Sequence, residues 1–451
     1  MEVKTADETG VSIRTVGWYG TVTVLALALV TAPALLSGAY ATALRTVLLV
    51  LLIGLVGRTY LGAVLAFRSA SPPDVELADP PTVSVVIPAY NEGPVIADTL
   101  DAALAVEYPT DELEIVACYE AASTDDTAEI VNRYADDHEE IVAIERDEEG
   151  GGKAKATNYA LQHASGEIIA SIDADHEFAP DAIERAVRYF VADEDIWCVK
   201  GRCYGSNPTD SLLALHATVE RHIAELADLF GREVFGGFTI FGGGQAFFRR
   251  ELFDQLGAFD EEILVEDVDM SARIHEAGKR IRVDPDVVTY EENPATLSAW
   301  WSQRTRWARG WMQVAVRYLP RLPFDSTLTR RARFDAAYTF VYALVPVVTV
   351  VAAPMLLLDR TLLTGGTYLP YDWLLWGLVG VAPFLTSLLI FVRDYRHGYS
   401  HHPAELLAAI TLWGYLFGQG IVYVTSFLDE FIFDRESVYV TTTRADTPVD
   451  D

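Results

Sequence analysis

Two aspartates one residue apart, Asp173 and Asp175, are candidates for holding a divalent cation. They directly follow an apolar run, Ile168 to Ile172, which is typical of a buried strand of a parallel sheet. In open α/β sheets ligands bind outside the carboxyl ends of such strands, and carboxylates at positions i and i+2 of an extended segment point the same way. Carboxylate oxygens suit Mg²⁺ or Mn²⁺, which usually share their coordination shell with substrate phosphates. An acidic surface turn is the alternative, so the surroundings of the pair must decide.

A loop that leaves another predicted strand, over 83–88, carries residues suited to a nucleotide. The loop reads Pro88-Ala-Tyr-Asn-Glu-Gly93. Its proline and its short polar stretch, with Tyr90 and Glu92, suit a surface against which a base can lie. Helix capping by Asn91 is an equally strong alternative.

Glycine-rich segments are found in two further places. Three glycines, 150–152, precede Lys153 and Lys155, which are two of only five lysines in the chain. Glycine lets the backbone approach a ligand closely, and lysine supplies a compact charge for phosphate. The spacing is not that of a Walker A motif, and a flexible loop with solvated lysines is the alternative. The second cluster, Phe241-Gly-Gly-Gly-Gln245, would let the chain pass close to a sugar, unless it is only a tight turn.

An acid pair is a candidate for proton transfer. Glu266 and Asp267 stand just before a helix predicted over 268–277. A carboxylate in that place can cap the helix. It can equally act as a general base that takes a proton from an attacking hydroxyl.

The run Gln303-Arg-Thr-Arg-Trp307 combines an amide, two guanidinium groups and an indole. Arginine can neutralise a pyrophosphate leaving group, and tryptophan offers a flat face to a sugar ring. An anchor at a membrane interface is the alternative, and it is strong for Arg304 and for the nearby Arg309.

These motifs need a scaffold that brings them together, and the segment 82–294 predicts one. Predicted strands alternate with predicted helices: strands over 83–88, 113–117, 141–144 and 168–172, and helices over 94–104, 125–134 and 154–163. This alternation indicates βαβ units and a parallel sheet. We therefore expect the motifs to gather at one edge of that sheet.

The composition predicts a membrane part beside this domain. The chain is 51% hydrophobic and its mean hydropathy is +0.17, which is high for a soluble enzyme. Apolar spans are predicted over 16–44 (one helix and a short turn), 46–67, 336–358, 373–392 and 406–428. The predicted organisation is two transmembrane helices (1–68), a proline-rich linker (69–81), the α/β domain (82–294), interfacial amphipathic helices (295–333), about three transmembrane helices (334–428) and a polar tail (429–451).

Basic residues predict the orientation in the membrane. Arg330, Arg331 and Arg333 precede the third span, and Arg393 and Arg396 follow the fourth. Positive residues near spans mark the cytoplasmic side, so the α/β domain is expected in the cytoplasm of a multi-pass cell-membrane protein. The last span contains Gly414, Gly418 and Gly420, which leaves a broken or re-entrant path open. Arg58, inside the second span, is expected to face protein or to snorkel to an interface.

The charge excludes one class of partner. A net charge of −31 argues against nucleic-acid binding. An acidic, lysine-poor surface fits a halophilic protein, because screening makes such self-repulsion tolerable in a high-salt cytoplasm. The three cysteines have no metal or redox spacing and are expected to be small core residues.

Taken together, the motifs resemble those of the membrane-embedded family 2 glycosyltransferases, which include cellulose, chitin and hyaluronan synthases. The resemblance covers about residues 82–311 and rests on five motifs in order: Pro88-Ala-Tyr-Asn-Glu92, Ser123-Thr-Asp-Asp-Thr127, Asp173-Ala-Asp175, Glu266-Asp267 and Gln303-Arg-Thr-Arg-Trp307. It implies a cytosolic, Rossmann-like α/β domain of the GT-A type inserted between transmembrane helices. It also implies an inverting, metal-dependent transfer from a nucleotide sugar.

The resemblance implies a role for each motif. Asp173 and Asp175 would lie at the diphosphate and its metal, and Lys153 would contact the donor. Asp267 would be the base, with Glu266 beside it. The segment Gln303, Arg306 and Trp307 would hold the diphosphate and the end of the acceptor.

The sequence departs from the family after the second strand. Such enzymes usually carry two aspartates there, one of which contacts the nucleotide base, whereas this chain reads Cys118-Tyr-Glu-Ala-Ala-Ser123. Glu120 is the preferred substitute, although counting back from Ser123 gives Ala121 instead. The nucleotide, expected to be UDP, is less certain for this reason.

Three functions compete. The first is transfer of a sugar to a growing polysaccharide or glycan at the membrane. The second is transfer of one sugar to a polyprenyl-phosphate or another lipid acceptor. The third is a non-catalytic nucleotide-sugar sensor or transporter subunit, against which the presence of Asp173, Asp175 and Asp267 together argues.

Overall fold

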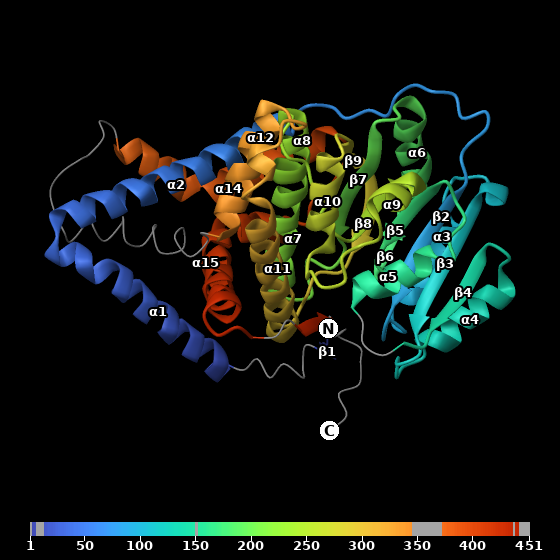
Figure 1. The fold of residues 1–451 in the computed structure, drawn as a ribbon, viewed down its shortest axis with the longest axis horizontal. Coiled ribbons are helices and arrows are strands. Elements are labelled where there is room, and N and C mark those ends of the chain that lie inside the picture. Colours follow the sequence, from blue (N-terminus) through green and yellow to red (C-terminus); the bar gives the residue numbers. More distant parts are fainter. Residues whose placement is uncertain (1, 6–12, 149–151, 345–371, 436–437, 442–451) are drawn as a thin grey trace.

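An eight-stranded mixed sheet organises the part of the chain between the apolar helices (Figure 1). The computed structural model describes residues 2–5, 13–148, 152–344, 372–435 and 438–441. The strands of this sheet are β2 (Val83–Ala89), β3 (Leu113–Glu120), β4 (Ile141–Arg146), β5 (Ile168–Ile172), β6 (His176–Phe178), β7 (Ile196–Gly205), β8 (Gln245–Arg249) and β9 (Arg280–Glu291).

The strand order is β4-β3-β2-β5-β8-β7-β9-β6. The four strands β4, β3, β2 and β5 are parallel, as the sequence predicts. Strand β8, however, runs antiparallel to both β5 and β7, and β6 runs antiparallel to β9. Strands β7 and β9 are parallel to each other. The prediction of a parallel sheet is therefore wrong for β8 and β6, because the periodicity of a single strand does not determine the direction of its neighbour.

Helices cover both faces of the sheet. One face packs against α3 (Ile96–Leu104), α4 (Thr127–Asp137) and α6 (Ala182–Ala192), and the other against α5 (Lys153–Leu161), α9 (Arg250–Leu256) and α10 (Glu266–Glu276). In β2 the side chains of Val83, Val85 and Ile87 enter the first core and that of Val86 enters the second. A strand buried on both faces reads as a continuous apolar run, which is why these strands could be predicted.

One helix start differs from the prediction. Helix α3 begins at Ile96 and its capping position is Val95, with no side-chain cap. Asn91 lies farther back, in the left-handed region at φ 54°. The capping role considered for Asn91 is therefore wrong, because this residue forms a turn that holds the loop after β2.

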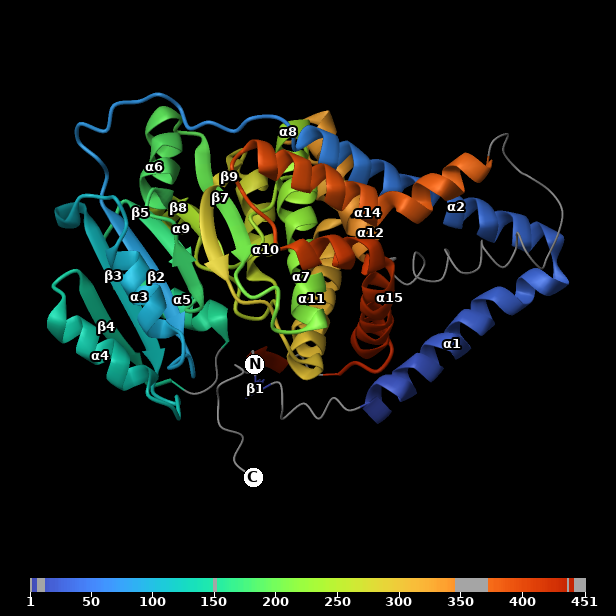
Figure 2. The same cartoon turned by 180° about the vertical axis from the view of Figure 1, so that it is seen from behind.

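The apolar helices lie together on one side of the sheet (Figures 1 and 2). They are α1 (Ile13–Leu36), α2 (Gly38–Leu65), α7 (Leu212–Ile223), a π-helical stretch η3 (Ala224–Phe230), α8 (Gly231–Phe235), α11 (Leu297–Tyr318), α12 (Arg330–Leu344), α14 (Asp372–Arg396) and α15 (Pro403–Phe431). Among the described residues, three helices are long and apolar enough to cross a membrane: Gly38–Leu65, Gly377–Arg396 and Pro403–Phe431.

Helix α15 is continuous through its three glycines. The predicted span over 336–358 is helical as far as Leu344, and its remainder lies outside the described residues. Arg58 of α2 faces protein as expected, since its guanidinium lies 3.1 Å from Asp228 and 3.3 Å from Asp335.

Many side chains of helix α11 are buried inside the protein. Trp300 and Trp301 pack against α7 and α15, and the Trp300 indole N–H donates to the Tyr415 hydroxyl at 2.8 Å. The first helix of the predicted interfacial segment thus lies where the sheet domain and the other helices meet.

The two chain ends pair with each other. Strand β1 (Glu2–Thr5) lies parallel to β10 (Val438–Thr441). This pairing gives regular structure to two segments of polar tails for which the sequence predicts none.

Candidate active site

A cavity of about 980 Å³ opens at the carboxyl ends of β2, β3, β4 and β5 and extends to α7, α11 and α15. Parallel strands end at the same edge of a sheet, and this is the edge where α/β proteins bind ligands. The cavity is lined by all eleven site residues predicted from the sequence: Tyr90, Glu92, Glu120, Lys153, Asp173, Asp175, Glu266, Asp267, Gln303, Arg306 and Trp307.

The two aspartates occupy the turn between β5 and β6. The Asp173 N–H donates to the carbonyl of Gly244 at 2.9 Å, and the His176 N–H donates back to the Asp173 carbonyl at 3.1 Å. Potential ligand atoms of Asp173, Asp175 and His176 lie within 4.8 Å of one another. The two half-buried carboxylates supply hard oxygen atoms, so the chemistry of the donor set fits Mg²⁺ or Mn²⁺.

Lys153 is the first residue of α5 and forms an ion pair with Asp173. Gly152 precedes it at φ 102°, a backbone conformation that favours glycine. Gly150 and Gly151, also singled out in the sequence, lie outside the described residues. The lysine charge thus stands directly beside the carboxylates that would face a diphosphate.

The second glycine cluster lies against the acid pair. Gly242, Gly243 and Gly244 all have positive φ, and a Cβ atom on Gly243 would stand 3.3 Å from Asp267 Oδ2. The Ser271 hydroxyl of α10 accepts the N–H of Phe241 at 3.2 Å. The loop is therefore fixed to the start of α10, and its backbone forms one wall of the cavity.

Glu266 and Asp267 are the first two residues of α10 rather than the two before it. Asp267 Oδ1 accepts the N–H of Val268 at 2.8 Å. Burial raises the pKa of both carboxyl groups, against the positive charges of Lys153 and Arg306, which lower it. Such an environment suits a carboxylate that exchanges a proton during catalysis.

Glu120 ends β3 and points its carboxylate into the cavity. Its Oε2 accepts from Arg146 at 2.6 Å, and Arg146 itself is buried at the end of β4. Burial raises the pKa of Glu120 more than Arg146 lowers it. Of the two residues considered for this place, Glu120 offers a carboxylate and Ala121, which also lines the cavity, does not.

The loop after β2 is held in place by the start of α4. The Asn91 side-chain oxygen accepts the N–H of Thr124 at 2.8 Å, and the N–H of Glu92 donates to the Thr127 hydroxyl at 2.8 Å. Tyr90 is thereby kept on the cavity wall near Glu120.

The arginines of α11 divide into two kinds. Arg306 faces the cavity and donates to the carbonyl of Leu264 at 3.5 Å. Arg304, which also reaches the cavity wall, is buried, pairs with Glu220 at 2.5 Å and lies 4.4 Å above the Trp307 ring. Arg309 is also buried and pairs with Glu430 at 2.7 Å. The alternative of a membrane-interface anchor is therefore wrong for Arg304 and Arg309, which form ion pairs inside the protein.

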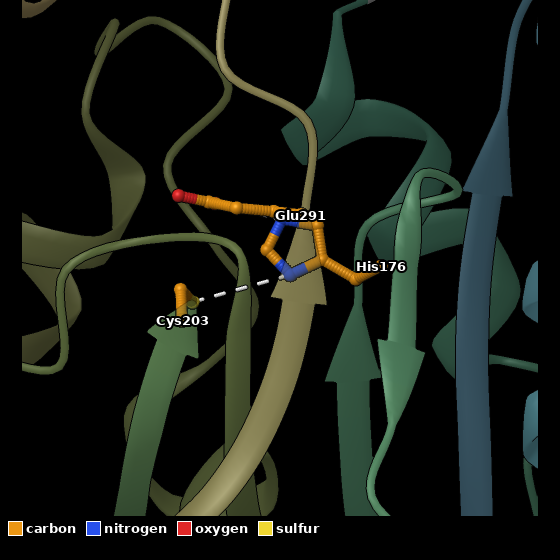
Figure 3. Close-up of side chains that lie close together, drawn as sticks. All are labelled: His176, Cys203 and Glu291. Atoms are coloured by element: carbon orange, nitrogen blue, oxygen red, sulfur yellow. Dashed lines mark hydrogen bonds and ion pairs between the residues drawn. The ribbon is translucent and has the colours of Figure 1, made fainter. Parts of the chain in front are cut away.

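Several lining residues could not be recognised in the sequence. They come from β4, α7, η3, β9 and α15: Arg146, Glu220, Arg221, Glu225, Glu291, Gln419 and Tyr423. Helix α7 contributes two of the set from a segment that reads as an ordinary amphipathic helix. The single sequence feature that could have pointed to this group is His176, which directly follows Asp175 and contacts Glu291 (Figure 3).

Comparison with known proteins places this geometry in a family. The profile described as "Glycosyltransferase like family 2" matches residues 80–310. The probable glycosyltransferase YdaM of Bacillus subtilis is 32% identical over 262 residues, which are 58% of this chain and 62% of that protein. The poly-beta-1,6-N-acetyl-D-glucosamine synthase of Staphylococcus aureus is 28% identical over 247 residues, 54% of this chain and 58% of that protein. The matched stretch thus spans less than two thirds of either relative.

A solved structure extends the similarity to the fold. The mannosyltransferase PcManGT from Pyrobaculum calidifontis, in complex with GDP-Man and Mn²⁺, superposes with a TM-score of 0.55 and 26% identity, over 84% of this chain and 99% of that one. The curled mixed sheet and the cavity at its edge define a glycosyltransferase of the GT-A type. The chain belongs to glycosyltransferase family 2, and it carries candidate membrane helices on both sides of that domain.

Proposed function

We propose that this enzyme transfers a sugar from a nucleoside-diphosphate donor to a growing glycan, with inversion and with the help of a divalent metal. The observation that carries the proposal is the meeting of Asp173 and Asp175, Lys153, the acid pair and the Gln303–Trp307 run around one cavity. These segments are far apart in the sequence, and each supplies a different requirement of sugar transfer.

In this proposal Asp173 and Asp175 hold Mg²⁺ or Mn²⁺. Bound there, the metal would offset the charge of the donor diphosphate. Lys153 and Arg306 supply positive charge from the two sides of the cavity to the leaving diphosphate. The structure of PcManGT is a complex with GDP-Man and Mn²⁺, which supports a metal of this kind.

Asp267 acts as the general base. It takes the proton of the acceptor hydroxyl as that oxygen attacks the sugar carbon, on the face opposite the leaving diphosphate, which inverts the configuration. Glu266 lies beside it, and the backbone of Gly243 lines the cavity against the Asp267 carboxylate. Gln303 and Trp307 hold the end of the acceptor, the indole by stacking on a sugar ring.

Glu120, Tyr90 and Glu92 form the nucleotide end. An ionised carboxylate can only accept hydrogen bonds, so Glu120 fits a base with a ring N–H, as uracil and guanine have. A UDP-sugar is the first expectation. GDP-sugars belong in the same test, because PcManGT was solved with GDP-Man.

The far end of the cavity supports a glycan as acceptor. Its lining includes the polar side chains of Glu220, Gln419 and Tyr423, which suit the hydroxyl groups of a sugar chain. A polysaccharide synthase among the similar proteins points to the same acceptor class. The three candidate spans support a reaction at the membrane, and the basic residues beside them favour the cytoplasm for the GT-A domain.

The test is a screen of nucleotide sugars with the purified full-length protein in detergent. UDP- and GDP-linked sugars are supplied with Mg²⁺, Mn²⁺ or a chelator, and release of nucleoside diphosphate and product length are measured. We expect release with one donor, dependent on metal and lost in Asp267→Asn. Full activity of Asp267→Asn, or no release with any donor, would contradict the proposal, and a product of one sugar on a lipid would replace the glycan acceptor.

A further inference from the structure

His176 is buried directly beside the proposed metal seat. Its side chain is 3% exposed and lies between Asp175, Glu291 and Cys203 (Figure 3). Ring atom Nε2 is 3.1 Å from Glu291 Oε2 and 3.8 Å from Asp175 Oδ1. Ring atom Nδ1 faces the Cys203 sulfur at 3.9 Å. The ring thus contacts one of the two metal-binding carboxylates and a second carboxylate behind it.

The hydrogen bond to Glu291 determines what this ring can do. Glu291 is held by the guanidinium of Arg221, which donates to both carboxylate oxygens. Burial favours the neutral acid, but Arg221 and His176 outweigh it and hold the pKa of Glu291 well below its usual range. An ionised carboxylate only accepts, so Nε2 of His176 is the donor. The nitrogen nearest to Asp175 therefore carries a hydrogen and has no lone pair for a metal.

The His176 ring packs closely against the second glycine cluster. A Cβ atom on Gly244 would stand 2.6 Å from the His176 Cε1 atom, so a side chain at this position would collide with the ring. The carbonyl of the same glycine accepts the N–H of Asp173 at 2.9 Å. The ring, the glycine loop and the turn that carries both aspartates are thus interlocked.

The contacts continue to the opposite side of the cavity. Arg221 of α7, which anchors Glu291, also lies 5.7 Å from the centre of the Trp307 ring on α11. A row of contacts, Asp175–His176–Glu291–Arg221–Trp307, therefore joins β6, β9, α7 and α11. It connects the metal side of the cavity to the side that would receive the acceptor.

We infer that His176 is a positioning residue, which orients Asp175 by hydrogen bonding to the Glu291–Arg221 pair and does not itself bind the metal. The inference rests on the proposed metal seat at Asp173 and Asp175. Partners that orient metal ligands in this way typically contribute about 10- to 100-fold to metal affinity. Loss of His176 should therefore weaken metal binding by a comparable factor.

The test measures Mn²⁺ affinity of the full-length protein in detergent, in the presence of UDP, by the paramagnetic resonance of free Mn²⁺. His176→Phe keeps an aromatic ring but removes the donor, and we expect it to weaken Mn²⁺ binding by about 10- to 100-fold. His176→Gln carries an amide N–H near the position of Nε2 and should stay within about threefold of the unmodified protein. Cys203→Ala, which removes the contact on the other ring nitrogen, is the matched control and should bind Mn²⁺ unchanged.

The variant Asp175→Asn distinguishes a failure of this inference from a failure of the proposed metal seat. If Asp175→Asn loses Mn²⁺ while His176→Phe keeps full affinity, the inference is wrong and the metal seat stands. If Asp175→Asn binds Mn²⁺ unchanged, the metal seat itself is wrong. If His176→Gln is as weak as His176→Phe, the ring nitrogen is a ligand and the positioning role is overturned. Should His176→Phe fail to fold, Glu291→Gln replaces it, and unchanged Mn²⁺ affinity in that variant contradicts the inference.

Discussion

At the residue scale, burial and nearby positive charges have opposite effects on the pKa of the acid pair at the start of α10. Burial disfavours the charged form of Asp267, while Lys153 and Arg306 favour it. The net effect is a raised pKa, so the group is a stronger base than an exposed aspartate. The same lysine pairs with Asp173, so one cation serves both sets of carboxylates.

The raised pKa of Asp267 predicts the acid side of the pH profile. A general base must be deprotonated, so kcat/KM falls as pH decreases through its pKa. We expect the midpoint of this fall in kcat/KM to lie above about pH 4, which is the ordinary pKa of aspartate. The limb should be missing from the residual rate of Asp267→Asn, which we expect to be about 10²- to 10⁴-fold lower in kcat.

The profile is obtained from initial rates of nucleoside diphosphate release in buffers of constant ionic strength. Glu262→Gln, which alters an exposed carboxylate of the preceding loop, is the matched control and should keep the profile unchanged. An acid limb at or below pH 4 in the unmodified enzyme would argue against Asp267 as the base.

Glu120 allows a separate prediction about the donor. Glu120→Gln preserves the length of the side chain and its contact with buried Arg146, but it removes the charge that accepts from the base. A hydrogen bond to a charged group contributes about 1.5–3 kcal/mol, so donor KM should rise at least about tenfold while kcat changes little. Steady-state kinetics at varied donor concentration measure KM and kcat. The control is Glu145→Gln, which alters an exposed carboxylate of β4. An unchanged KM would mean that the base binds elsewhere.

At the scale of elements, helix α11 combines a structural role and a role in the site. One set of its side chains packs into the bundle through Trp300, Trp301 and the buried arginine ion pairs, and another set lines the cavity. A one-residue shift along this helix would turn every side chain by about 100° around its axis and would take the lining set out of the cavity.

Two arginines three positions apart on α11 should therefore respond differently to substitution. Arg306→Ala removes a charge next to the leaving group and should lower kcat by about 10²- to 10³-fold with a small effect on stability. Arg309→Ala leaves Glu430 without its buried partner and should cost about 3–5 kcal/mol of unfolding free energy. Thermal unfolding and kinetics of both variants in the same detergent measure the two effects. Equal losses of stability would contradict this division of roles.

The helices and strands differ in how well the sequence predicts them. The strands β2 to β5 and the motifs after them could be predicted, because burial on both faces and the abrupt change to polar residues are local properties. The contribution of α7 could not, since Glu220 and Arg221 are ordinary charges of an amphipathic helix until the fold brings β9 and α15 beside them. The antiparallel direction of β8 was missed for the same reason, because it depends on the path of α7, η3 and α8.

At the scale of the whole molecule, charge is the dominant feature. With 65 acidic and 34 basic residues the chain repels itself, and this repulsion is screened over about 10 Å at 0.1 M salt and about 3 Å at 1 M. We expect the melting temperature in non-ionic detergent to rise with KCl between about 0.1 and 2 M. Sucrose, which stabilises without screening, is the control. A melting temperature that does not rise with KCl would contradict adaptation to high salt.

Helix α7 has one more consequence for the whole molecule. Its consecutive residues Glu220, Arg221 and His222 bind Gln419 of α15, Glu291 of β9 and Glu405 of α15, in that order. The residue that anchors Glu291 is therefore flanked on both sides by attachments to a candidate membrane span. A helix changes its tilt when the thickness of the bilayer departs from its apolar length, and any tilt of α15 acts on α7 at these two attachments. We therefore expect the rate of sugar transfer to vary with the acyl-chain length of the surrounding lipids, through three neighbouring side chains of α7.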